Sequence, residues 1–143
     1  MLHFGQAKAR LNAEGIPCEL LAVTDDISSA PLNEWQKRRG VAGDLMVFKA
    51  ASAAAEAGYD LAAVLEVAER ANQRTRSLGV AFSGCTLPGA EHPLFTVPEG
   101  MMAVGRGIHG EPGIRDVPIS TADELAELLV SSLLKEVPQG ITT

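Results

Sequence analysis

The segment Met-Met-Ala-Val-Gly-Arg-Gly-Ile-His-Gly-Glu-Pro-Gly, residues 101–113, joins two kinds of structure. Its apolar residues 101–104 predict a short strand, because continuous apolar runs bounded by glycine are typical of buried strands. The strand leads directly into the glycines and the proline around His109, which predict a loop. His109 is therefore either a solvated side chain on a turn or a reactive group, since glycines let backbone amides approach a small ligand closely.

Helix and strand signals alternate along the rest of the chain. They predict an α/β fold with a partial open sheet flanked by helices. Asp60 is expected to cap one helix, and Thr121 and Glu124 form a capping box at the start of another. Apolar periodicity and glycine stops predict the remaining boundaries. The predicted helices cover residues 2–14, 44–57, 61–77 and a stretch from residue 122 onward, and the predicted strands cover residues 18–23, 80–82 and 101–104.

Length and composition describe one mildly acidic domain. The chain has 143 residues and a net charge of −6. Nucleic acid is excluded as a partner, because phosphate binding needs clustered basic residues and the only basic run, Lys37–Arg39, is short enough to be a solvated helix end. No run approaches the roughly 20 apolar residues of a membrane span. The N-terminus also lacks a signal-peptide pattern, so we expect a cytoplasmic protein without a membrane partner.

Asp25 and Asp26 directly follow the predicted strand over residues 18–23. The short apolar run is consistent with a buried parallel strand. Ligands of open α/β sheets bind at the carboxyl ends of such strands, which makes both aspartates candidate binding residues. The alternative is that they form a turn and cap the following segment, because aspartate bonds readily to its local backbone.

The chemistry available to His109 is narrowed by excluding several motifs. No two of the three histidines have the spacing of a metal site, so no metal is expected. His109-Gly110-Glu111 spells the H-x-E of zinc deaminases, but no P-C-x-x-C follows it. Gly105, Gly107 and Gly110 match the G-x-G-x-x-G of a dinucleotide-binding site only loosely. That motif must open a helix, and Pro112 and Gly113 argue against one. Nucleophilic catalysis by the imidazole remains: its nitrogen could add to a ketone carbonyl and form a hemiaminal, with Glu111 orienting the ring or the loop.

Four segments together resemble the dihydroxyacetone kinase family, and specifically its substrate-binding subunit or domain, DhaK. They occur in the family's order over nearly the whole chain: Arg39–Gly43, Ala53–Gly58, Ser83–Pro88 and Gly107–Gly113. The resemblance implies that His109 is the catalytic histidine that binds the ketose carbonyl as a hemiaminal. Gly110 and Glu111 would lie beside it in the substrate site.

The resemblance also implies which partners the chain has. This domain binds dihydroxyacetone or a similar small ketose and holds no cofactor itself. A separate helical domain or subunit holds the phosphoryl donor, either ATP or a tightly bound ADP that the phosphoenolpyruvate phosphotransferase system recharges. The full-length protein is expected to be a homodimer.

Residues 1–143 resemble only the middle of the family's domain. The resemblance implies that the family's glycine-rich histidine segment and its general-base aspartate would lie upstream of Met1. We therefore expect a single partial domain truncated at both ends, with exposed sheet edges that favour self-association. Two functions stay open: the ketose-binding part of a kinase, or a catalytically inactive ketose-binding or interaction module. The ketose, dihydroxyacetone or a longer one such as erythrulose, and the donor also stay open.

Overall fold

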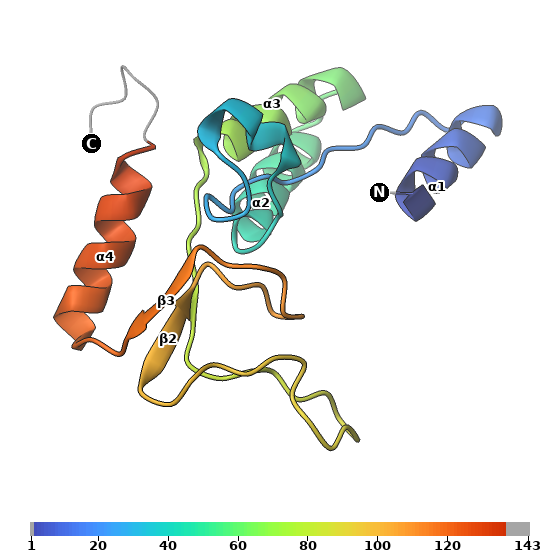
Figure 1. Ribbon diagram of the computed structural model, residues 1–143. Coiled ribbons are helices and arrows are strands. Elements are labelled where there is room, and N and C mark those ends of the chain that lie inside the picture. Colours follow the sequence, from blue (N-terminus) through green and yellow to red (C-terminus); the bar gives the residue numbers. More distant parts are fainter. Residues whose placement is uncertain (1, 137–143) are drawn as a thin grey trace. The chain divides into compact units, whose positions relative to one another are not determined.

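The computed structural model describes residues 2–136 of the chain (Figure 1). These residues form two compact units. One unit comprises residues 2–25 and 40–75, and the other comprises residues 26–39 and 76–136. The expectation that residues 1–143 form a single partial domain stays a prediction. None of the helices in the described part is both long enough and apolar enough to cross a membrane.

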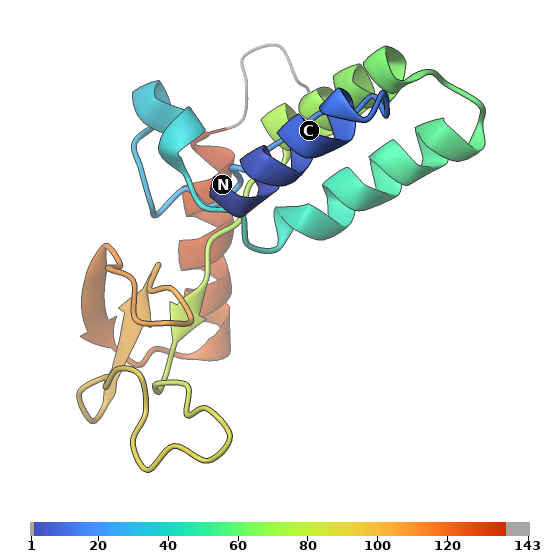
Figure 2. The same ribbon diagram turned by 90° about the vertical axis from the view of Figure 1, so that its right-hand side faces the viewer.

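Three α-helices form the regular part of the first unit. α1 covers Leu2–Ala13, α2 covers Gly43–Glu56 and α3 covers Leu61–Arg74. All three were predicted, and α2 and α3 lie side by side as a hairpin (Figure 2). Alanines such as Ala54 and Ala68 are buried, and their small side chains let two helices approach closely. Asp60 caps α3 as expected: its carboxylate accepts a bond from the amide of Ala63 at 2.9 Å.

The predicted strand over residues 18–23 is wrong. This segment is irregular, and the hydrogen bonds at its end go to a side chain instead of a neighbouring strand. The amide of Asn72 in α3 donates to the carbonyl of Ala22 at 3.1 Å and accepts from the backbone N–H of Thr24 at 2.9 Å. A strand needs a partner strand for its backbone groups, and here one buried amide takes that place.

Asp25 caps α2 from a distant position in the sequence. Its two carboxylate oxygens accept from the backbone N–H groups of Val41, at 2.9 Å, and Gly43, at 2.8 Å. Asp25 is fully buried, and a Cβ on Gly43 would lie 2.5 Å from its Cγ. The carboxylate thus satisfies amides at the start of the helix, where negative charge is also favourable.

The second unit is built around a small antiparallel sheet. β1 covers Val80–Ala81, β2 covers Met101–Val104 and β3 covers Arg115–Pro118. β2 is central and nearly inaccessible to solvent, because both neighbours pair with it. The sequence predicted β1 and β2 but not β3. The mixed α/β class with an open sheet is confirmed, although the sheet is antiparallel and its third strand is not the predicted one.

Two helical segments complete the second unit. α4 covers Ala122–Leu134, and the predicted capping box is present: Thr121 accepts from the amide of Glu124, whose carboxylate accepts from the amide of Thr121 at 2.9 Å. A short 3-10 helix, η1, covers Leu32–Lys37 and ends where the basic run begins, although its bounds were not predicted. Residues 137–143 of the sequence lie outside the described part.

Candidate functional site

His109 lies in the loop of the β2–β3 hairpin. Val104 and Arg115 are the last paired residues of the two strands, and the N–H of Ile114 donates to the carbonyl of Val104 at 2.8 Å. At the tip of the loop, the N–H of Gly110 donates to the carbonyl of Gly107 at 3.0 Å. This bond closes a four-residue turn with His109 at its third position. The predicted passage from strand to loop is confirmed, and the return strand holds both ends of the loop together.

Glycines permit the path of this loop at two positions. Gly105 has φ +76° and Gly110 has φ +95°, a region that residues with a Cβ rarely adopt. Gly107 has a different role, because a Cβ there would collide with the carboxylate of Glu111 and lie 2.6 Å from Nη1 of Arg39. The absent side chain leaves the room that both groups occupy.

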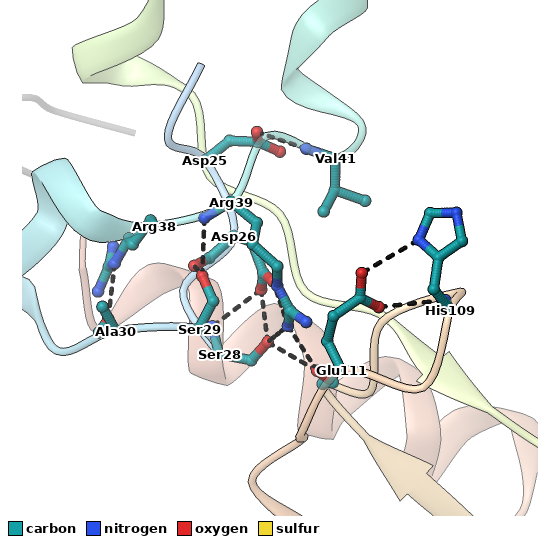
Figure 3. A network of polar contacts seen from close by, with 11 residues as sticks. Asp25, Asp26, Ser28, Ser29, Ala30, Arg38, Arg39, Val41, His109 and Glu111 are labelled. Carbon is teal, nitrogen blue, oxygen red and sulfur yellow. Dashed lines mark hydrogen bonds and ion pairs between the residues drawn. The ribbon is translucent and has the colours of Figure 1, made fainter. Parts of the chain in front are cut away.

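Glu111 contacts both the ring and the backbone of His109 (Figure 3). Its Oε1 lies 3.0 Å from Nδ1 of the imidazole, and its Oε2 accepts from the N–H of His109 at 3.1 Å. Hydrogen bonds from its own backbone amide and then from His109 lower the pKa of Glu111 below its usual range. An ionised carboxylate can only accept, so the neutral imidazole beside it carries its proton on Nδ1.

This tautomer places the lone pair of His109 on Nε2, the nitrogen opposite Glu111. The His109 side chain is 72% exposed, so a small molecule can reach it. A carboxylate on one side of the ring and an accessible nitrogen on the other is an arrangement that can orient an imidazole for nucleophilic addition.

A polar network holds the first residue of the loop (Figure 3). Arg39 donates from Nη2 to the carbonyl of Gly105 at 3.0 Å and from Nε to Asp26 at 2.9 Å. Ser28 Oγ lies 3.0 Å from the same carbonyl and also bonds to Asp26. Four residues from two distant parts of the sequence therefore meet where β2 passes into the loop.

Phe95 packs against another part of the same loop. The guanidinium of Arg106 lies over the Phe95 ring, 5.5 Å from its centre, and a Cβ on Gly110 would be 3.4 Å from Phe95 Cβ. Phe95 is held by the segment at residues 84–85: Gly84 leaves room for its carbonyl, and the carbonyl of Cys85 accepts from the N–H of Leu94 at 2.8 Å. The Ser83–Pro88 motif thus helps to seat the aromatic ring that contacts the His109 loop.

Comparison with known proteins identifies the family, because the Dak1 domain family matches residues 1–142. The chain belongs to the Dak1 domain family. The L-erythrulose kinase of Pectobacterium atrosepticum is 97% identical over 143 residues, which are 100% of this chain and 24% of that protein. The dihydroxyacetone-binding subunit DhaK of the PTS-dependent dihydroxyacetone kinase 2 of Listeria innocua is 46% identical and matches 96% of this chain and 41% of that subunit.

A solved structure supports the same assignment. The dihydroxyacetone kinase from C. freundii, in complex with AMP-PNP and Mg²⁺, matches with a TM-score of 0.85 and 39% identity, over 96% of this chain and 25% of that one. The expected membership of the dihydroxyacetone kinase family, and of its substrate-binding domain, is confirmed. The Dak1 chain spans about a quarter of the length of the erythrulose kinase that it matches.

Within this Dak1 chain, the two neighbouring aspartates have different structural roles. Asp25 is the remote cap of α2, whereas Asp26 accepts from the N–H of its near neighbour Ser28 at 2.9 Å and pairs with Arg39 at 2.8 Å. The expected local turn therefore holds for Asp26. Neither carboxylate lies at the end of a strand, since the strand expected before them is absent.

The interpretation of Lys37–Arg39 as a solvated helix end is wrong for two of its residues. Arg38 is buried and donates to both carboxylate oxygens of Glu136, at 2.5 and 2.7 Å, while Arg39 belongs to the network at Gly105. The side chain of Lys37 is 69% exposed. A charge run does not reveal which of its members has a partner elsewhere in the sequence.

The other two histidines, His3 in α1 and His92 in the loop between β1 and β2, are both exposed. Among residues 2–136, no group of three or more His, Cys, Asp or Glu side chains is arranged to hold a metal ion. Sequence reasoning missed Ser28, Arg39 and Phe95 as neighbours of the His109 loop. The only signal for Arg39 was its place in one of the segments that carry the family resemblance.

Proposed function

We propose that this chain is the ketose-binding part of an erythrulose or dihydroxyacetone kinase-like phosphotransferase, and that His109 holds the substrate. The observation that carries the proposal is the exposed imidazole whose Nδ1 contacts Glu111 at 3.0 Å and whose Nε2 therefore bears the lone pair. The names of two relatives, an L-erythrulose kinase and a dihydroxyacetone-binding subunit, support a small hydroxyketone as the ligand.

The bond between His109 and the ketose would form by addition. Nε2 attacks the carbonyl carbon, the C=O π bond opens and its electron pair goes to the oxygen, while the ring becomes positively charged. Glu111 stabilises that charge from the Nδ1 side. Transfer of the Nδ1 proton to the oxygen, through Glu111 or water, then gives a neutral hemiaminal. No atom leaves, so the adduct contains the complete ketose.

The addition also explains how a ketose would be distinguished from a polyol. Glycerol has hydroxyl groups like those of dihydroxyacetone but no carbonyl, so Nε2 of His109 has nothing to attack. The amides of Gly107, His109 and Gly110 donate hydrogen bonds within the loop itself, so the proposed selection of a ketose rests on its carbonyl group.

The phosphoryl group would come from outside this chain. The solved C. freundii enzyme contains AMP-PNP and Mg²⁺, and the Listeria innocua kinase is PTS-dependent, so related proteins use either nucleotide or PTS-derived phosphate. We propose that a separate helical domain or subunit holds the donor, and that residues 107–111 present the ketose to it. The homodimeric full-length protein and the cytoplasmic location stay predictions.

The test is the intact mass of the 143-residue chain under non-denaturing conditions after incubation with L-erythrulose or dihydroxyacetone. We expect an increase by one complete ketose that His109→Ala abolishes. His92→Ala is the matched control, because it removes another exposed loop histidine of the same unit and should leave the adduct unchanged. Glycerol should give no adduct.

The same experiment separates the proposal from its alternatives. A ketose adduct that persists in His109→Ala would contradict the proposed role, and an adduct that has lost water would indicate an imine on a lysine. With 2-¹³C-labelled dihydroxyacetone, the carbonyl resonance should move to the region of saturated carbon in the wild type only. Phosphorylation after addition of a donor subunit would then distinguish a kinase component from an inactive ketose-binding module.

A further inference from the structure

Arg39 connects two parts of the second unit through one guanidinium group. Its Nε and Nη2 both contact Oδ2 of Asp26, at 2.9 and 2.8 Å, which fixes the plane of the group. Nη2 also donates to the carbonyl of Gly105 at 3.0 Å. A planar group held on one side by a carboxylate presents its remaining donors in a fixed direction.

Ser28 cannot replace this donor to Gly105. Its hydroxyl lies within bonding distance of both Asp26 and the Gly105 carbonyl, but it carries a single proton and can donate to only one of them at a time. The guanidinium has five N–H groups and donates to both partners simultaneously. The carbonyl at the start of the loop therefore depends mainly on Arg39.

The same guanidinium lies close to the carboxylate that faces His109 (Figure 3). An ideal Cβ on Gly107 would lie 2.6 Å from Nη1 of Arg39 and would overlap the Glu111 carboxylate, so both groups contact Gly107. Glu111 in turn accepts from the backbone N–H of His109 and faces Nδ1 of its ring. The guanidinium thus bonds to the loop at Gly105 and lies against it at Gly107.

We propose that Arg39 is the positioning residue of the His109 loop: by bonding to Gly105 and lying against Gly107, it keeps Glu111 opposite Nδ1 and thereby keeps the lone pair of His109 on Nε2. The inference rests on the proposed function, since the position of the lone pair matters only if His109 is the nucleophile. Asp26 and Ser28 hold Arg39 in place.

The experiment measures the tautomer of His109 and the affinity for a ketose in the same samples. Ring ¹⁵N chemical shifts report which nitrogen of His109 carries the proton, and native mass spectrometry with dihydroxyacetone gives the dissociation constant. The variant is Arg39→Lys, which keeps the charge but cannot bond to Asp26 and Gly105 in the same geometry. The control is Arg115→Gln, an exposed arginine of β3 next to the loop.

In the wild type we expect the Nδ1–H form. In Arg39→Lys we expect a mixture of both tautomers and a dissociation constant raised about tenfold or more, the effect of losing a hydrogen bond with a charged donor. Arg115→Gln should match the wild type. Ser28→Ala leaves Arg39 in place and should shift the tautomer and the dissociation constant in the same direction, but by smaller amounts. It is the substitute variant if Arg39→Lys does not fold.

The outcomes separate this inference from the proposed function. The role of Arg39 is overturned if the wild type forms the adduct and a folded Arg39→Lys variant keeps the same tautomer and affinity. The same result in Ser28→Ala overturns it if Arg39→Lys does not fold. Either result leaves the proposed function intact. A changed tautomer in Arg39→Lys without any adduct in the wild type overturns the proposed function and supports the positioning of the ring by Arg39.

Discussion

Replacing Gly105 by alanine tests how strongly the His109 loop is anchored. Gly105 has φ +76°, and a residue with a Cβ pays about 1–2 kcal/mol in this left-handed region. The new Cβ would also lie 2.7 Å from Oγ of Ser28 and even closer to its Cβ, so the two backbones must separate. Separation lengthens the bonds that Ser28 and Arg39 make with the Gly105 carbonyl, both 3.0 Å long.

The expected loss follows from adding these contributions. A neutral hydrogen bond contributes about 1 kcal/mol and one with a charged donor about 1.5–3 kcal/mol. With the backbone strain, Gly105→Ala should lower the free energy of unfolding by about 3.5–6 kcal/mol. Urea denaturation followed by the fluorescence of Trp35 is the assay, because the chain has one tryptophan and it lies in η1 of the same unit.

Two other glycines of the second unit are matched controls. Gly89 has φ +82° and nothing within 4 Å of an added Cβ, so Gly89→Ala isolates the backbone strain and should cost about 1–2 kcal/mol. Gly79 has neither a positive φ nor a close neighbour, and Gly79→Ala should be nearly neutral. Equal losses for Gly105→Ala and Gly89→Ala would refute the anchoring of the loop by Ser28 and Arg39.

Three further outcomes are expected elsewhere in the chain. Asp60→Ala should weaken hydrogen-exchange protection in the first turn of α3 by about 1 kcal/mol, because it removes the helix cap. His109→Ala should raise the pKa of Glu111 only part of the way to its usual value in an NMR titration, because the bond from the amide of Glu111 itself remains. In the wild type, the contact with His109 stabilises the loop at pH values above the usual carboxyl pKa. This stabilisation is lost as the pH falls through the lowered pKa of Glu111. Glu136→Ala should destabilise the second unit by about 3–5 kcal/mol in the Trp35 fluorescence assay, because it leaves the buried guanidinium of Arg38 without its carboxylate. An unchanged midpoint in the last case would show that Arg38 finds another partner.

The elements that the sequence predicted correctly carry local signals. Asp60, Thr121 and Glu124 act on amides within three residues of themselves, and the apolar run at 101–104 is buried as a continuous strand. Gly15 and Gly58 end their helices at φ +78° and +83°, which follows from the absence of a side chain. For the helix caps and the glycine stops, the deciding contact lies within one or two turns of chain.

The elements that the sequence did not predict depend on distant partners. The apolar run at 18–23 forms no strand because its last backbone groups bond to Asn72. β3 reads Arg-Asp-Val-Pro, which has the polarity and the proline of a loop, and it is a strand because it lies at the edge of the sheet, where both are tolerated. Of the candidate site, His109, Gly110 and Glu111 adjoin in sequence and were predicted together. Arg39 was not, because nothing near it in sequence points to Gly105.

The separation between Gly105 and its anchors has a consequence for the order of folding. The β2–β3 hairpin closes a short loop, a microsecond event that needs only neighbouring residues. The bonds from Arg39 and Ser28 join positions 66 and 77 residues apart, and such long-range closures cost more chain entropy. The hairpin that carries His109 is therefore expected to close first, and its loop to become fixed last, when Arg39 and Ser28 bond to Gly105. In the reverse direction, partial unfolding that releases only the long-range bonds would leave the hairpin closed. The proposed affinity for a ketose would then be lost before the strands separate.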